Sequence, residues 1–317
     1  ETRLRDAERW LDTALDTGSG IGEPSEAEIY PEPFAPERHP PRDKLRPKMV
    51  VADREEFRRL PGWIAIYRAG QALVRGDVPA TLTYAQQALD LIPEDHHPMR
   101  GAAAALLGLA YWTSGDLEAA HRMYADGMAH LQMAGNISDT IGGVIALADI
   151  RMAQGRLHEA MRIYEQALQL ATAHGDPVLR GTADMYVGMS ELRREHNELD
   201  AARQHLLRSK EQGEHTGFPQ NPYRWRVAMA RIKETEGDLD GALDLLQEAE
   251  SLYVSAFSPN VRPIAALKTR VWVAQGRVGE ALGWVRVQGL SADDDLRYLS
   301  EFEHITLARV LLAQAQH

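Results

Sequence analysis

Apolar residues recur along most of the chain at intervals of three and four positions, in paired stretches separated by a short polar break. One pair covers residues 103–113 and 117–131, and neither stretch shows the strict alternation of a β-strand. The breaks share a pattern of glycine, a polar residue and then leucine or valine, with a small residue five positions after the glycine. This pattern predicts helical hairpins and an all-α fold.

The break occurs six times, at intervals of 39, 40, 42, 40 and 39 residues. Such a regular period indicates a repeat array. The residues expected to end each first helix are Gly76, Gly115, Gly155, Asn197, Gly237 and Gly276. Glycine adopts the left-handed conformation that ends a helix more readily than any other residue, and asparagine is the second most suitable residue type. The small residues, which allow close helix approach, are Thr81, Ala120, Ala160, Ala202, Ala242 and Ala281.

The second repeat carries further residues at fixed spacing. Leu107 and Gly108 are followed by Tyr111, and Ala120 and Tyr124 follow the glycine of the break. This spacing resembles the tetratricopeptide (TPR) repeat, although the period is roughly 40 residues rather than about 34. An aspartate before the second helix, as in Asp116, is a suitable helix cap. We therefore predict a TPR-like α-solenoid of about six to seven helical hairpins, each stacked on its neighbours.

The sequence divides into three segments. Residues 1–17 have the spacing of a second helix whose first helix is missing. Residues 18–60 contain 7 of the 16 prolines, which predicts a linker or an inserted loop, with a functional flap over a groove as the alternative. Residues 61–317 form the predicted superhelical domain and end in a first helix without its second. We therefore expect the natural protein to extend in both directions.

Composition narrows the possible functions. Acidic residues exceed basic ones, for a formal net charge of −11, which argues against a nucleic-acid-binding surface in this segment. Cysteine is absent, which excludes disulfides and thiolate chemistry here and fits a cytoplasmic location. The longest apolar run, 101–112, is too short to cross a bilayer, so we expect no membrane association.

Motifs for catalysis or cofactor binding are missing. The glycine-rich run 18–22 follows no strand, and no Gly-Lys dipeptide of a P-loop occurs. His158 lacks the second histidine of a zinc-protease helix, and His96 and His97 lie in a predicted turn with no second ligand pair at metal spacing. We therefore expect neither enzymatic activity nor a metal or cofactor site in these residues.

A ligand would bind on the concave side, which the first helices line in a TPR array. Counting the glycine of each break as position 15, positions 2, 5, 9 and 12 should face this groove. The candidate binding residues are Trp63, Trp112, Asp149, Asp184, Glu191, Arg224, Arg231, Arg270, Phe302 and Arg309. The predicted groove is aromatic at its start, acidic in its middle and rich in arginine at its end. Arginines bind carboxylates or phosphates, and aromatic rings stack on sugars or apolar groups.

The same residues also fit purely structural roles. The arginines near the ends of first helices suit the helix dipole and can pair with acids on the next helix. Asp149 and Glu191 can be ion partners of neighbouring arginines, and Trp63 and Trp112 can be packing residues. Both interpretations stay open at the level of sequence.

Several strings from residue 60 onward are similar to one family. These are Leu91-Ile92-Pro93-Glu94-Asp95, Ser258-Pro259-Asn260-Val261-Arg262-Pro263, and Glu301-Phe302-Glu303-His304 with the helix after it. Together they resemble the central region of the large ATP-dependent regulators of the LuxR family, the MalT type. Residues 18–60 depart from the resemblance.

The resemblance implies a sensor between an ATPase domain, where ATP would bind, and a DNA-binding helix-turn-helix, both outside this sequence. Its partner would be a small-molecule inducer or a regulatory protein, and inducer binding would control self-association into a homo-oligomer. A TPR-type scaffold that binds a helix or a peptide is the alternative. A helical accessory domain of an enzyme is a third possibility, and the residues alone do not name the inducer.

Overall fold

The computed structural model describes residues 54–173, 179–255 and 257–316, and the chain divides into two units, Glu1–Ile64 and Ala65–His317. In the first unit only residues 54–64 are described, and they form the start of helix α2 (Arg54–Val74). The predicted segment 1–17 and most of segment 18–60 lie outside the described residues. Residues 54–60 are helical rather than part of a linker. The prolines of the linker stop at Pro47, and two glutamates in the first turn suit the positive end of the helix dipole.

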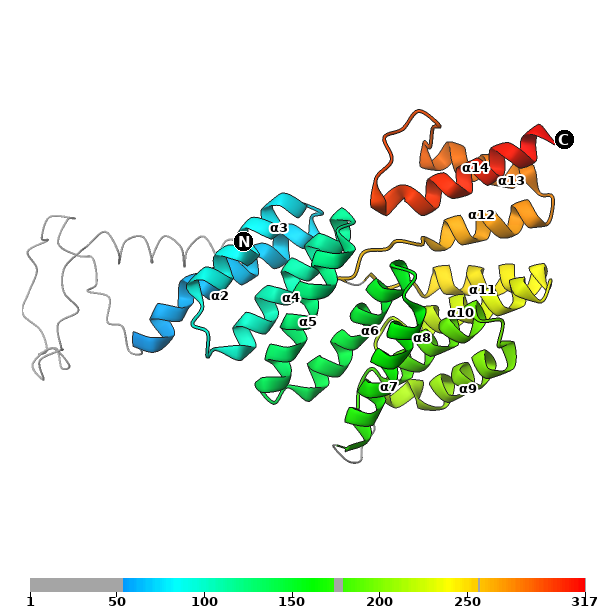
Figure 1. Cartoon of the computed structure of the whole chain (residues 1–317). Coiled ribbons are helices and arrows are strands. Elements are labelled where there is room, and N and C mark those ends of the chain that lie inside the picture. The colour runs from blue at the N-terminus through cyan, green and yellow to red at the C-terminus, as the bar shows by residue number, and fades with distance from the viewer. Residues whose placement is uncertain (1–53, 174–178, 256, 317) are drawn as a thin grey trace, which may run out of the picture. The chain divides into compact units, whose positions relative to one another are not determined.

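The second unit continues as helical hairpins (Figure 1). The described residues contain thirteen α-helices and a single 3-10 turn, with no strand among them, which confirms the predicted all-α fold. After α2, the helices are α3 (Val78–Leu91), α4 (His97–Ser114), α5 (Leu117–Met133), α6 (Ile137–Ala153), α7 (Leu157–Ala173), α8 (Thr182–Glu195), α9 (Leu199–Thr216), α10 (Asn221–Thr235), α11 (Leu239–Ser251), α12 (Ile264–Ala274), α13 (Val278–Gln288) and α14 (Glu301–Ala315), with the 3-10 turn η3 (Tyr298–Ser300) before α14. Even-numbered helices are the first helices of the hairpins.

Each hairpin turn has the conformation expected from its glycine. Gly115 has φ 90°, and the backbone N–H of Asp116 donates to the carbonyl of Tyr111 at 3.0 Å, which closes a Schellman motif at the end of α4. The same hydrogen bond recurs in the other five turns. Asn197 takes this position in the fourth hairpin, with φ 60°, and among the described residues other than glycine only Asn197 has a positive φ.

The second helix of a hairpin begins directly after the turn. Asp77, Asp116 and Asp238 each accept a hydrogen bond from a backbone N–H three residues on, as predicted for Asp116. The small residues five positions after the turn glycine are fully buried in all six hairpins, because the two helices cross there. The predicted hairpin unit is therefore confirmed in each repeat.

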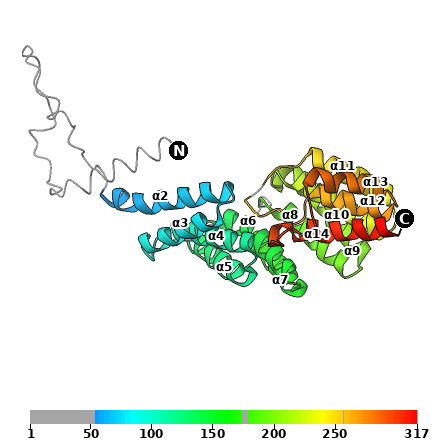
Figure 2. The same cartoon turned by 90° about the horizontal axis from the view of Figure 1, so that it is seen from above.

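The core is a series of small clusters rather than one central core. One cluster joins α6, α7 and α8, the next joins α8, α9 and α10, and a third joins α10, α11 and α12. Each hairpin thus buries its apolar face against the first helix of the following hairpin, as a solenoid requires. Figure 2 shows the last helices, α11 to α14, gathered together within this unit.

Two segments depart from the simple stacking of hairpins. The α11–α12 connection (residues 252–255 and 257–263) is not helical, and it is as long as the α13–α14 connection (residues 289–300), which contains η3. The segment after α13 brings Tyr298 back to the end of α4, where its hydroxyl accepts a hydrogen bond from Nε1 of Trp112 at 3.1 Å. The second of these segments therefore joins parts of the chain that are 186 positions apart in the sequence.

Candidate ligand-binding cavity

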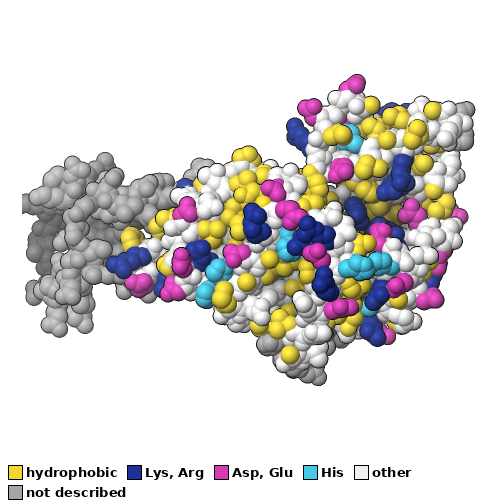
Figure 3. Space-filling model, in the orientation of Figure 1, with side chains coloured by type: hydrophobic (Ala, Val, Ile, Leu, Met, Phe, Trp, Pro, Cys, Tyr) yellow, Lys and Arg dark blue, Asp and Glu magenta, His cyan; other side chains and the backbone are white. Residues whose placement is uncertain are grey.

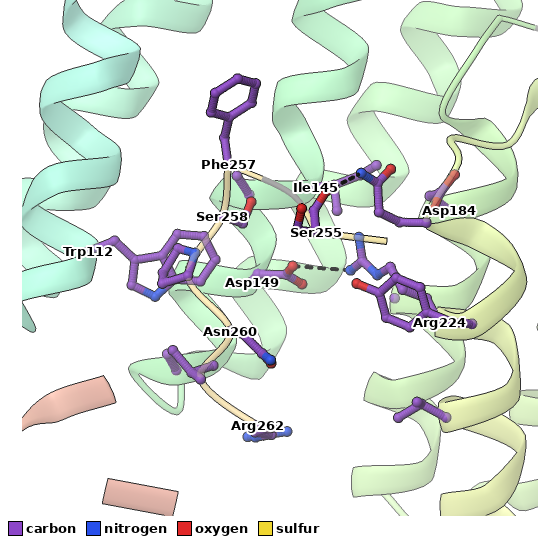
Figure 4. A pocket seen from close by; sticks show the side chains of 18 of the residues that line it. Trp112, Ile145, Asp149, Asp184, Arg224, Ser255, Phe257, Ser258, Asn260 and Arg262 are labelled. Carbon is purple, nitrogen blue, oxygen red and sulfur yellow. Dashed lines mark hydrogen bonds and ion pairs between the residues drawn. The ribbon is translucent and has the colours of Figure 1, made fainter. Parts of the chain in front are cut away.

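A cavity of about 870 Å³ lies among the first helices of the second unit. Its walls come mainly from α6, α8, α10 and the α11–α12 connection (Figure 4), and α2, α4, α5 and α12 contribute a few residues. The repeats place equivalent positions of successive first helices side by side, so residues about 40 positions apart in sequence meet in one wall. Six of the ten predicted binding residues line it: Trp112, Asp149, Asp184, Glu191, Arg224 and Arg231.

A partly buried ion pair crosses the cavity wall. Nη2 of Arg224 in α10 lies 3.1 Å from Oδ2 of Asp149 in α6 (Figure 4). The hydroxyl of Tyr164, which is fully buried in α7, donates to the other carboxylate oxygen of Asp149 at 3.4 Å. The pair therefore joins hairpins that are two repeats apart.

Asp184 of α8 is a second carboxylate near Arg224. It is fully buried, and its Oδ2 accepts a hydrogen bond from the backbone N–H of Phe218 at 2.9 Å. Phe218 precedes α10 and its ring also lines the cavity. With two carboxylates and one guanidinium, this part of the wall has a net negative charge when all three groups are ionised.

Burial sets the ionisation of these groups. It raises the pKa of Asp149, an effect that Arg224 and Arg262 oppose. Burial likewise raises the pKa of Asp184, again against Arg224. Burial disfavours the charge of Arg224 itself, but Asp149, Tyr164 and Asp184 outweigh it and raise its pKa. The guanidinium is thus the main group that opposes the effect of burial on the pKa of both acids.

A second ion network lies further along the cavity. Arg231 of α10 pairs with Glu191 of α8, and its Nη2 lies 3.2 Å from Oε1 of Glu195. Oε1 of Glu195 also lies 2.5 Å from Nη2 of Arg194. Asp149 and Glu191 are therefore both ion partners of arginines. Glu191 pairs with an arginine on the neighbouring first helix, and Asp149 pairs with one two first helices further along.

The remaining four predicted residues lie elsewhere. Arg270 and Phe302 line a second cavity of about 280 Å³, which shares Arg231 with the first, and the Arg270 guanidinium carbon lies 4.9 Å from the centre of the Phe302 ring. Trp63, in α2, and Arg309, in α14, are exposed and line neither cavity. Trp112 lines the cavity but is only 2% exposed, because it packs against α5 and α6.

The sequence pattern did not predict the contribution of the α11–α12 connection. Tyr253, Phe257 and Arg262 line the large cavity, and the Tyr253 ring lies 5.1 Å from that of Tyr223 in α10. The carbonyl of Ser255 accepts a hydrogen bond from the side chain of Gln220 at 3.4 Å. The turn-forming prolines in this stretch indicate a long connection, but only the fold shows that it lies in the groove.

The described residues contain no group of three or more histidine, aspartate or glutamate side chains placed to hold a metal ion. In the same part of the chain, no helix has both the length and the apolar character needed to cross a membrane.

The helical hairpins, their turns and the cavity along the first helices define a TPR-type repeat protein. A family description, the MalT-like TPR region, matches residues 62–317, and the chain belongs to this family. The resemblance seen in the sequence is thereby confirmed. No curated protein matches the chain.

Solved structures with related folds are distant in sequence. The chain is similar to a Pseudomonas aeruginosa protein named pilF, with 13% identity, a TM-score of 0.48, and coverage of 82% of this chain and 99% of that one. It is also similar to a tetratricopeptide repeat protein from Parabacteroides merdae, with 17% identity, a TM-score of 0.46, and coverage of 81% and 91%. A putative kinesin light chain with TPR-like repeats from Podosopora anserina has 17% identity, a TM-score of 0.46, and coverage of 61% and 95%.

Proposed function

We propose that residues 65–317 are the sensing region of a bacterial MalT-type transcription activator and that they bind a small-molecule inducer in the large cavity. The observation that carries this proposal is the cavity itself, because about 870 Å³ lies within the usual range of small-molecule sites. Binding, rather than catalysis, is the proposed role, and it would take place in the cytoplasm without a cofactor in these residues.

The walls of the cavity give the inducer a means to change the packing of the array. Asp149 in α6, Glu191 in α8 and their arginine partners in α10 come from three successive hairpins. A ligand that contacts these helices favours one relative arrangement of the hairpins, by an amount equal to its difference in affinity for the two arrangements. We propose that this change controls self-association, and that ATP and DNA bind in other domains of such a regulator.

Thermal denaturation against a metabolite library tests this proposal. A ligand at 100 times its Kd stabilises the chain by about 2.7 kcal/mol. Ser258→Trp adds a bulky ring to the cavity wall and should abolish the shift, whereas Ser251→Trp, at the exposed end of α11, should preserve it. The absence of any shift in the wild-type chain, or an equal shift in both variants, would contradict the proposal.

Peptide binding is a second candidate, and one observation favours it. The α11–α12 connection is non-helical polypeptide and already lies along the groove, where its residues line the cavity. A peptide partner would take its place. Selection of peptides against the purified chain, followed by hydrogen exchange, should then show faster exchange in residues 257–262. Selected peptides should lose affinity for the double variant Arg231→Glu with Arg270→Glu, and unchanged affinity would argue against this candidate.

A further inference from the structure

Four arginines from different elements converge on the smaller cavity of about 280 Å³. Arg194 comes from α8, Arg231 from α10, Arg262 from the α11–α12 connection and Arg270 from α12. In the space-filling view of Figure 3, the surface is hollowed beside α14, with hydrophobic side chains in the hollow and basic side chains at its edges.

The positive charges of this cavity are only partly neutralised. Glu195 pairs with both Arg194 and Arg231, and Glu191 also pairs with Arg231. Arg262 and Arg270, in contrast, form no ion pair with any other residue that the structure describes. Glu234 is the single acid among the described lining residues. The cavity therefore has more guanidinium groups than carboxylates.

Some of the arginine donors are buried without an acceptor. Nε of Arg270 and Nε of Arg194 are inaccessible to solvent and have no hydrogen-bond partner within the described chain. Burial, then the nearby Arg309, lowers the pKa of Arg270. Burial, then Arg262, lowers the pKa of Arg231. Buried donors without partners and mutual repulsion both destabilise this group of arginines, and a bound anion would relieve both effects.

We propose that this cavity binds an oxyanion group, a phosphate or a carboxylate, which forms the end of the ligand. Guanidinium groups bind both in a bidentate manner. The ring of Phe302, 4.9 Å from the Arg270 guanidinium, supports one face of that group. The two cavities share Arg231, Arg262 and Leu267, so a ligand can place its anionic end here and its body in the large cavity. The anion site itself does not depend on the proposed function. Only the statement that an inducer fills the large cavity rests on it.

Isothermal titration calorimetry on the whole chain tests the anion site, with inorganic phosphate and succinate as probes and sodium chloride of matched ionic strength as reference. Saturable binding of either probe is the expected result, and the stronger probe identifies the oxyanion. Arg262→Gln and Arg270→Gln should each weaken binding by about tenfold, because each removes charge-assisted hydrogen bonds. Arg262 is exposed on a connection, so its variant keeps the fold even if that of Arg270 does not.

Arg286→Gln is the matched control, since Arg286 is an exposed arginine of α13 and lines neither cavity. Its affinity for the probe should equal that of the wild type. Heats no larger than those of chloride, or equal affinity in all three variants, would overturn the proposal. A metabolite that stabilises wild type and both cavity variants equally would refute the anion site but preserve the proposed function. Saturable oxyanion binding without any metabolite response would support the anion site alone.

Discussion

Replacing Arg224 by glutamine tests the ion network in the cavity wall. The substitution removes the cation that lies 3.1 Å from Asp149 and leaves this acid and Asp184 without their main counter-charge. Two unit charges at this distance attract by about 5 kcal/mol in a medium with an effective dielectric constant of about 20. The desolvation of both groups offsets part of this attraction, and the side chains of Arg224 and Asp149 remain 25% and 22% exposed. We expect the variant to lose about 3 kcal/mol of stability near neutral pH.

The loss should depend on pH in a defined direction. Burial already raises the pKa of Asp149 and of Asp184 above the ordinary value of 3.8, and both rise further without Arg224. A carboxyl whose pKa is raised by folding binds more protons in the folded than in the unfolded state. Stability therefore decreases as pH rises from the unfolded pKa through the folded pKa. The deficit of Arg224→Gln is smallest near about pH 4.5 and largest near about pH 7.5.

Urea denaturation followed by far-UV circular dichroism at both pH values measures this difference. Arg226→Gln is the matched control on the same helix, since Arg226 pairs with the exposed Glu248 at 2.7 Å. Its loss should stay within about 1 kcal/mol. A deficit below about 1 kcal/mol for Arg224→Gln, or one of equal size at both pH values, would show that the network does not hold the carboxylates in their charged form.

Five further substitutions make three tests of the hairpins, each by the same denaturation assay. Gly188→Ala places a Cβ 2.2 Å from Oη of Tyr164 and should lower the free energy of unfolding by about 1–3 kcal/mol. Gly283→Ala, at a helical position with open space around it, should raise the free energy of unfolding by up to about 1 kcal/mol. Equal effects of the two substitutions would contradict the packing argument. Asn197→Gly removes the steric strain of the left-handed conformation and should stabilise the chain by about 0.5 kcal/mol. Asn197→Ala should destabilise the chain by about 1 kcal/mol, and the reverse order of the two variants would refute this account. Asp116→Ala removes the cap of α5 and should cost about 1 kcal/mol, so an unchanged midpoint would show that the cap is not needed.

The sequence predicted the face that the first helices present to the groove, because a helix repeats about every 3.6 residues and the turn glycine fixes the count in each hairpin. Counting from these glycines placed Asp149, Glu191 and Arg231 on one wall, where the structure has them. The count did not apply to Trp63 and Arg309, which lie at the two ends of the array and line neither cavity.

The sequence by itself determined the repeat, because the period and the turn residues are local properties of the chain. It also determined the all-α class and the residue types available to the groove. Only the tertiary structure decided which acid faces which arginine, since Asp149 meets Arg224 across 75 residues. It also decided that Arg262 reaches the groove on the α11–α12 connection. Such contacts depend on the curvature of stacked hairpins and on the path of an irregular segment, and neither leaves a periodic signal in the sequence.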